Sequence, residues 1–259
     1  MYKLYAPDAL KQRRNINRCK ISYSSILALL IWQASLGVES QRRFCEKLVN
    51  LSHSRFNRRA RMLLPLIYLI RHGLNEEVDL SGDILIIDSF PVPVCQPIRN
   101  RRAKIFRGYA DIGYKATQKI YYYGFKVHAI VSDDGYLLDY IVTKASVHDA
   151  KETVELITNA HPDNRYLLGD EGYLGKNLHQ RLEQMGYTLW TPYRKNMKNA
   201  QKHNKHYLMA LRRTIESDFL LLSYYNAENN RARSLAGFQE RLEVAILAYN
   251  MAYCLERFN

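Results

Sequence analysis

The spacing of apolar residues divides this chain into a helical first part and a mixed second part. Through residue 80, apolar side chains recur at helical intervals, and residues that cap helices precede the runs. The predicted helices span Ser22 to Ser35 with a stop at Gly37, about 39–50, and a stretch that begins at Ser52 or Ser54 and kinks at Pro65. We therefore expect an all-helical domain over residues 1–80.

From residue 81 onwards, short apolar strands alternate with helices. Residues 84–87 form a continuous apolar run that ends at Asp88, and two β-rich runs flank an Asp134-Gly135 turn, which favours a hairpin. Further strands are predicted in RYLLGD and YTLWTPY, and further helices over about 149–159, 176–186, 207–225 and 235–258. This order predicts an α/β domain over residues 81–259, a mixed sheet with helices on its faces.

Two of the predicted strands end on an aspartate. Asp88 follows one apolar run and Asp170 follows another, in RYLLGD. Ligands of open α/β sheets bind beyond the carboxyl ends of strands, and two adjacent carboxylates repel each other unless a cation neutralises them. Oxygen ligands at an open site suit Mg²⁺ together with phosphate oxygens. The pair is therefore either a magnesium site or two aspartates that only begin turns.

A third acid, Glu216, is expected on a helix beside two arginines. Arg212 and Arg213 precede it by four and three residues, so all three side chains share one face of the helix. Taken alone, this arrangement is typical of a surface ion pair rather than of a catalytic group.

The charge of the chain favours a polyanionic partner. The formal net charge is +13 and the isoelectric point is near 9.5. Residues 1–80 hold 14 Lys and Arg against 6 Asp and Glu. Two short helices followed by an arginine-rich one resemble a helix-turn-helix, whose last helix would enter a DNA groove. The alternative is a small helical bundle with a solvated basic face.

The cysteines and the apolar runs indicate the cellular compartment in which the protein works. The four cysteines are scattered and form no Cys-x-x-Cys pair, which argues for a reducing environment and against a disulfide framework or a cysteine zinc site. The longest early apolar run, Ile26–Trp32, is far shorter than the roughly 20 residues of a spanning helix. We expect a cytoplasmic protein without a membrane segment.

Two further stretches combine cations with features of DNA-binding surfaces. Residues 99–126 interleave cations with tyrosines, which suits phosphate contacts and base stacking, and residues 194–205 form a basic loop. Both stretches could instead be ordinary solvated surface. The candidate DNA-binding residues are Arg55, Arg58, Arg59, Arg101, Arg102, Lys104, Arg107, Arg194, Lys195, Arg212 and Arg213.

Taken together, the three acids resemble the Asp-Asp-Glu triad of insertion-sequence DDE transposases. The motifs IDSF, GDEGYLG and RRTIESDF carry them in order, separated by 82 and then 46 residues. The stretches SRFNRRAR, LGVESQRRF, VTKASVHDA and AILAYNM are also similar to pieces of bacterial members of that family. The resemblance covers essentially the whole chain and implies a ribonuclease-H-like fold for the α/β domain.

The resemblance also implies a function. Asp88, Asp170 and Glu216 would be the catalytic residues and would hold Mg²⁺, for which Mn²⁺ can substitute. The expected reactions are phosphodiester hydrolysis at the ends of an insertion sequence and transesterification that joins the freed 3′-hydroxyl to target DNA. Related transposases often have a basic residue two turns after the glutamate, where this chain has Ser223, so Arg212, Arg213 or the preceding loop would contact the DNA instead.

The same resemblance implies partners and leaves alternatives open. The expected partner is double-stranded DNA, at the terminal repeats of the element and at the target, with further copies of the chain assembled on the paired ends. The expected place of action is the bacterial cytoplasm, at the nucleoid. The alternatives are a catalytically inactive DNA-binding regulator derived from a transposase, and a related metal-dependent nuclease that never joins strands.

Overall fold

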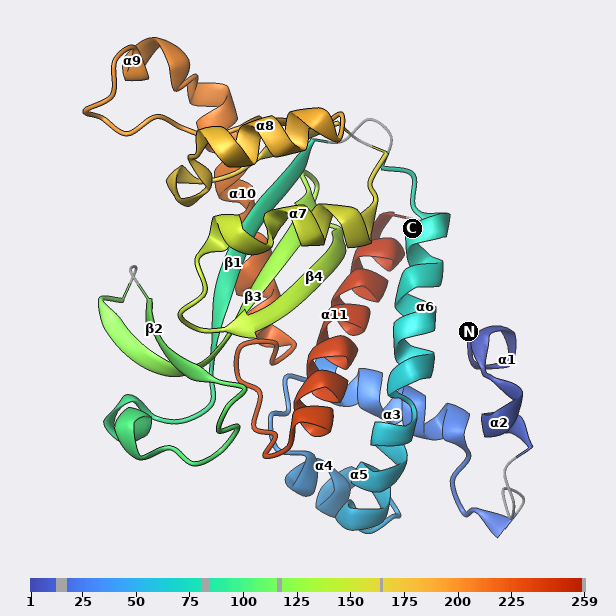
Figure 1. Ribbon diagram of the computed structural model, residues 1–259. Helices are drawn as coiled ribbons and strands as arrows, with labels where there is room; N and C mark the ends of the chain where they lie inside the picture. Colours follow the sequence, from blue (N-terminus) through green and yellow to red (C-terminus); the bar gives the residue numbers. More distant parts are fainter. Residues whose placement is uncertain (13–17, 81–83, 116–117, 164, 258–259) are drawn as a thin grey trace. The chain divides into compact units, whose positions relative to one another are not determined.

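Two compact units make up the computed structural model (Figure 1), which describes residues 1–12, 18–80, 84–115, 118–163 and 165–257. The helical unit comprises Met1–Val78 and Leu221–Asn259, and the sheet unit comprises Asp79–Leu220. Residues 221–259 therefore pack with the N-terminal helices, whereas the sequence-based division placed them with the α/β domain. Residue 258, at the end of the predicted closing helix, lies outside the described residues.

The helical unit follows the capping signals of the sequence. Ser22 accepts a hydrogen bond at 3.0 Å from the backbone N–H of Ser25 and so caps the helix that follows it, and Ser40 caps the next helix in the same way. Gly37, with φ at +62°, lies just after the first of them. The helices are α1 (Tyr2–Tyr5), α2 (Asp8–Lys11), α3 (Tyr23–Ser35), α4 (Gln41–Leu48), α5 (His53–Met62), α6 (Leu64–Glu77) and α11 (Leu235–Arg257).

Pro65 begins a helix instead of kinking one. α5 ends at Met62 and α6 begins at Leu64, with the proline in its first turn. The first backbone N–H groups of a helix have no partner within it, so proline is tolerated there without losing a hydrogen bond. The predicted third helix is thus two helices.

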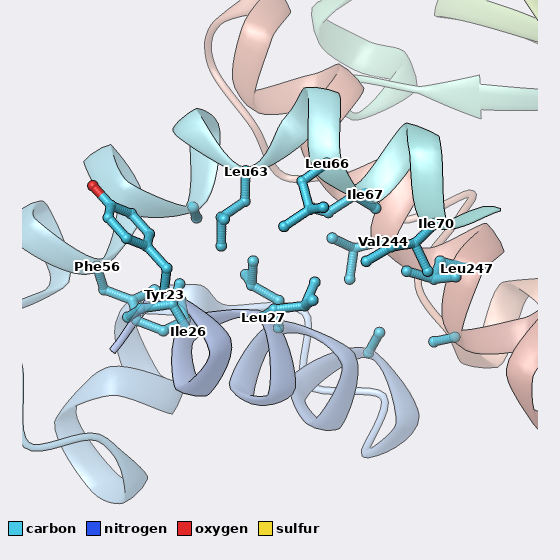
Figure 2. Packing of buried hydrophobic residues seen from close by; sticks show 14 of the residues in the cluster. Tyr23, Ile26, Leu27, Phe56, Leu63, Leu66, Ile67, Ile70, Val244 and Leu247 are labelled. Atoms are coloured by element: carbon cyan, nitrogen blue, oxygen red, sulfur yellow. The ribbon is translucent and has the colours of Figure 1, made fainter. Parts of the chain in front are cut away.

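The core of the helical unit is built by α3, α5, α6 and α11. Figure 2 shows Val244 and Leu247 of α11 among side chains of α3 and α6, such as Leu27 and Ile70. These residues are almost completely buried. Apolar burial of this kind supplies the main stabilisation of the unit. No helix among the described residues combines the length and the apolar character needed to cross a bilayer.

The sheet unit contains all six strands, and they form one mixed sheet. The order is β2-β3-β1-β5-β6, and β4 also pairs with β3. β3 runs antiparallel to β1, β2 and β4, whereas β1, β5 and β6 are parallel neighbours. The strands are β1 (Leu85–Pro93), β2 (Asp111–Lys115), β3 (Ile120–Ser132), β4 (Leu137–Lys144), β5 (Tyr166–Leu168) and β6 (Thr188–Trp190).

Helices connect and flank these strands as predicted. The α-helices are α7 (Asp149–Ala160), α8 (Lys176–Gln184), α9 (Ala200–His203) and α10 (His206–Tyr224), and two 3₁₀-helices are η2 (Pro97–Arg102) and η3 (Glu171–Tyr173). The hairpin forms at the expected turn, where Gly135 has φ of +101°. The sheet order and its flanking helices confirm the predicted ribonuclease-H-like α/β fold, with an all-helical region before it.

The side chains of β1 alternate between the two faces of the sheet. Leu85 and Ile87 belong to a buried cluster that includes residues of α7 and α8. On the opposite face, Phe90 contacts Phe219 of α10, with ring centroids 4.8 Å apart. Figure 1 accordingly shows α7 and α8 on one face of the sheet and α10 on the other. Asp88 shares the α10 face, because it is two residues before Phe90.

Candidate active site

The register of two parallel strands brings Asp88 and Asp170 to the same level of the sheet. Leu85 lies opposite Leu167 and Ile86 lies opposite Leu168. Each of these pairs is 82 residues apart along the chain, which is also the separation of the two aspartates. Asp170 follows the end of β5, as predicted. Asp88 lies within β1, because β1 continues to Pro93 through its pairing with β3.

The backbone around Asp170 is shaped to hold its carboxylate. Asp170 caps η3, and its Oδ1 accepts a hydrogen bond at 2.7 Å from the N–H of Gly172. A Cβ atom at residue 172 would lie 2.8 Å from this oxygen and 3.6 Å from Oδ2 of Asp149. The glycine of the GDEGY motif therefore permits two acidic side chains to approach the same turn.

Burial and the charges of neighbouring carboxylates raise the pKa of both aspartates. Desolvation is the main cause for Asp88, the charge of Asp170 adds to it, and the pKa of Asp88 rises to about 7. Burial likewise raises the pKa of Asp170, and the nearby Asp149 contributes in the same direction. The Arg212 guanidinium opposes both shifts. The site thus concentrates negative charge that calls for a cation.

Arg212 connects Asp88 with the third predicted acid. Its Nη1 lies 3.6 Å from Oδ2 of Asp88, and its Nη2 lies 3.0 Å from Oε1 of Glu216. The predicted pairing of Arg212 and Glu216 on one face of α10 is confirmed. The side chain of Arg212 is 14% exposed, whereas that of Glu216 is 64% exposed. Arg212 therefore bridges Glu216 and Asp88, and Glu216 lies at the solvent-exposed side of the site.

Asp149, the first residue of α7, is a fourth acid at this site that the sequence did not single out. Its Oδ1 accepts hydrogen bonds from Ser89 Oγ at 2.7 Å and from Lys126 Nζ at 3.1 Å. Nδ1 of the buried His128 lies 3.7 Å from the same oxygen. Burial is the main cause that lowers the pKa of His128, to about 4. The imidazole is therefore neutral near pH 7, and Lys126 supplies the positive charge.

The only signal for Asp149 in the sequence is the VTKASVHDA motif. Its position after a strand suggested a helix cap, and His148 does cap α7, by accepting a hydrogen bond from the N–H of Ala150 at 3.3 Å. Nothing in the local pattern shows that Asp149 also contacts Ser89 of β1, 60 residues earlier in the chain. That contact depends on how α7 packs on β1 and β3.

The donor chemistry at the site fits a hard divalent cation. Asp88 and Asp170 offer buried carboxylate oxygens with further carboxylates nearby, and such an ion would offset both the burial and the repulsion. Glu216 is held by Arg212 at the exposed side. Within the described part of the chain, no three His, Cys, Asp or Glu side chains gather closely enough to enclose a metal ion. Asp88 and Asp170 therefore form a two-aspartate site. A third metal ligand would have to move towards them.

Arg59 is the one candidate DNA-binding residue that the structure buries. Its guanidinium lies over the ring of Tyr23, 4.4 Å from the ring centroid, and only 8% of the residue is exposed. It contributes to the core of the helical unit and does not face DNA. Arg55 and Arg58, on the same helix, are exposed.

The other candidate cations lie on the surface of the sheet unit. The backbone of the basic loop is fixed at its base, because Asn204 exchanges hydrogen bonds with both backbone groups of Tyr193. His203 stacks on Tyr193 with ring centroids 3.7 Å apart. Arg213 donates a hydrogen bond to the carbonyl of Met209. The exposed candidates are Arg101, Arg102, Lys104, Arg107, Arg194, Lys195 and Arg213.

Comparison with known proteins assigns the family. The family model described as "Transposase DDE domain" matches residues 79–251, which is more than half of the chain and includes all three predicted acids. Comparisons with curated proteins and with solved structures gave no match. The matched region contains the mixed sheet, the two paired aspartates and Glu216 in the order that the motifs predicted. The chain belongs to the DDE transposases of the insertion-sequence type.

Proposed function

We propose that this protein cuts DNA at the ends of an insertion sequence and joins those ends to target DNA, with Mg²⁺ or Mn²⁺ as cofactor. The observation that carries the proposal is the pair of aspartates at one level of two parallel strands, where their pKa values are raised. Such a pair is costly for folding in the absence of a cation and is suited to bind one.

The proposed roles follow from the positions of the side chains. Asp88 and Asp170 hold the metal from neighbouring strands, and Glu216 completes the site from α10. The bound metal would supply Lewis-acid stabilisation of the charge that develops on the phosphate oxygens. Lys126 and Ser89 hold Asp149 next to the aspartates by hydrogen bonds, so they keep the acidic side of the site rigid.

Arg212 determines how Glu216 can take part. The guanidinium now lies between the carboxylates of Asp88 and Glu216, so the ion pair with Glu216 must open for the glutamate to join the aspartates. Glu216 is already 64% exposed, so water can solvate its carboxylate as the pair opens. The released guanidinium can then form hydrogen bonds with a DNA phosphate.

The reaction can be tested with the full-length protein and DNA that carries the sequences flanking its coding region. We expect end-labelled DNA to be nicked in the presence of Mg²⁺ and its 3′-end to be transferred to a target plasmid. Asp88→Asn, Asp170→Asn and Glu216→Gln should each lower the rate at least about 100-fold, since even the outer-shell partners of metal ligands are worth about 10- to 100-fold. Gel analysis of cleaved and joined products measures both steps.

A matched control distinguishes a catalytic acid from a nearby charge. Glu171 adjoins Asp170 in sequence but begins η3 and is exposed, so solvent screens its carboxylate. Glu171→Gln should therefore keep wild-type activity. Equal activity of Asp88→Asn and the wild type would remove the catalytic assignment, and cleavage without any joined product would identify a nuclease.

A DNA-binding regulator without catalysis is the second candidate function. The observation that favours it is the pairing of Glu216 with Arg212, which keeps the glutamate from the two aspartates. Titration with Mn²⁺, followed by electron paramagnetic resonance, separates the two candidates. The catalytic proposal expects binding that Asp88→Asn and Glu216→Gln each weaken, whereas a regulator would show no specific Mn²⁺ binding and would still bind DNA.

A further inference from the structure

The ribbon formed by β2 and the first part of β3 has one covered face and one open face. Gly113 on β2 approaches Ala145 so closely that a Cβ atom at residue 113 would lie 2.4 Å from the carbonyl oxygen of Ala145. Tyr122, opposite Gly113, is buried. The alternate residues Ile112, Tyr114 and Tyr121 lie on the other face and are exposed. We call these three residues the tyrosine face.

Two aromatic rings meet on this tyrosine face. Tyr114 and Tyr121 are cross-strand partners, and their ring centroids are 5.0 Å apart at an interplanar angle of 52°. Tyr114 is 51% exposed and Tyr121 is 65% exposed. Large aromatic side chains are usually buried more deeply than this. A pair of exposed rings on this two-stranded ribbon therefore points to a ligand that stacks on them.

Cations are held beside the tyrosine face by η2. Asn100 donates a hydrogen bond at 2.8 Å to the carbonyl of Tyr121 and accepts one at 3.2 Å from the N–H of Tyr123. These bonds fix η2 against β3 and place Arg101 and Arg102 next to the rings. A surface hollow lies between the two elements, and it is lined by Pro97, Ile98, Asn100, Arg101, Arg102, Ile112 and Tyr121.

The side chains that line the hollow indicate which kind of ligand it can bind. The lining side chains are apolar, aromatic or cationic, except for the neutral amide of Asn100, and none of them is acidic. The guanidinium groups of Arg101 and Arg102 make no ion pair with a described residue. They are free to bind phosphates, while Ile112 and the tyrosine rings offer flat apolar surface. In a DNA duplex the faces of the bases are stacked on one another, so only unpaired bases can use such a surface.

We propose that the tyrosine face and η2 bind single-stranded DNA, with unpaired bases stacked on Tyr114 and Tyr121 and phosphates at Arg101 and Arg102. The inference rests on the proposed function in one respect, namely that DNA is the partner of this chain. Strands separate at a DNA end that is being cut and joined, and this surface holds one of them. The hollow is formed within the sheet unit alone.

The test measures binding without any metal, so that it does not depend on catalysis. Fluorescence anisotropy with a labelled single-stranded oligonucleotide and with a labelled hairpin duplex, both in EDTA, gives the two affinities of the full-length protein. The double variant Tyr114→Leu/Tyr121→Leu should lose roughly 5- to 150-fold in affinity for single strands, the range that base–aromatic stacking supplies. Its affinity for the duplex should be unchanged.

Three further variants sharpen the comparison. Tyr121→Phe keeps the ring and should bind single strands like the wild type, whereas Tyr166→Leu removes an equally exposed tyrosine of β5 and should have no effect. Arg101→Gln/Arg102→Gln should weaken both DNA forms, because phosphate contacts do not depend on base pairing. Asp88→Asn should retain binding of single strands, which separates this surface from the catalytic site.

Several outcomes would overturn the inference while leaving the proposed function intact. One is unchanged binding of single strands by the Tyr114→Leu/Tyr121→Leu variant. Another is an equal loss for single strands and duplex, which would identify the face as a duplex contact. A change in oligomeric state of this variant in size-exclusion chromatography, without a loss in DNA affinity, would identify it as a contact between copies of the chain.

Discussion

At the scale of single residues, Glu240 is the least expected side chain of the helical unit. It lies on α11, is completely buried, and neither of its carboxylate oxygens has a hydrogen-bond partner among the described residues. Burial raises its pKa to about 7, although the charges of Arg241 and Arg61 act against the shift. A buried carboxyl group of this kind is protonated in the folded protein at mildly acidic pH.

The raised pKa predicts that the stability of the helical unit depends on pH. Between the ordinary pKa of 4.5 and the folded value of about 7, the folded state binds the proton that the unfolded state releases. The free energy of unfolding therefore falls as the pH rises through this window, by on the order of 3 kcal/mol in total. Glu240→Gln cannot ionise and should be more stable than the wild type at pH 8 but not at pH 4.5.

Urea denaturation at the two pH values measures this difference. Trp32 lies in the helical unit and Trp190 in the sheet unit, so a Trp190→Phe background makes tryptophan fluorescence report on the helical unit alone. Glu256→Gln, at an exposed position of the same helix, is the matched control and should follow the wild type. An identical pH dependence for Glu240→Gln and the wild type would contradict the prediction.

At the scale of elements, a buried ion pair joins α6 to α11. Arg71 Nε lies 2.7 Å from Oε1 of Glu243, and the two side chains are 1% and 2% exposed. Removing one partner leaves an uncompensated charge in the core, which costs about 3–5 kcal/mol, whereas replacing both by apolar residues is often neutral. We expect Glu243→Leu alone to lower the free energy of unfolding by that amount.

The double variant separates the ion pair from simple packing. Arg71→Met/Glu243→Leu should recover most of the stability lost in Glu243→Leu, when both are followed by Trp32 fluorescence in urea. If the double variant were less stable than the single one, Arg71 would be stabilised by other contacts and the pair would not be the link between the helices.

The start of a helix could be predicted to within a few residues wherever a capping residue precedes apolar residues at helical spacing. Ser22 and the His148-Asp149 step mark helix starts by local chemistry, and α3 and α7 begin there. The 82 residues between Asp88 and Asp170 equal the register offset of β1 against β5, which is why the two aspartates lie at the same level. Local signals and one parallel pairing therefore account for the correct part of the prediction.

Contacts between distant elements could not be read from the sequence. The many apolar residues of α11 indicate a buried helix, but they do not show that it packs among the N-terminal helices. The segment from residue 99 to 126 reads as a basic, tyrosine-rich insertion, and only the pairing of Tyr114 with Tyr121 reveals its open face. In the same way, the buried position of Arg59 depends on Tyr23, 36 residues earlier in the chain.

At the scale of the whole molecule, the net charge of +13 is shared between two units that each expose cations. Binding to DNA then releases counterions in proportion to the number of phosphates neutralised. For each phosphate contact, the slope of log affinity against log salt concentration is about −0.9. This dependence counts the phosphate contacts of the whole protein, whichever sequence the DNA has, and a variant in one unit reveals the share of that unit.

The salt dependence therefore tests whether the helical unit binds DNA or only carries a solvated basic face. Arg55 and Arg58 are exposed on α5 and make no ion pair with a described residue. If both contact phosphates, Arg55→Gln/Arg58→Gln should lower the slope of log affinity against log salt concentration by roughly 2, as measured by anisotropy on duplex DNA in EDTA. Arg42→Gln removes an exposed cation that is already paired with Glu46 and should leave the slope unchanged. An unaltered slope in the double variant would show that Arg55 and Arg58 neutralise no phosphate and belong to a solvated basic face.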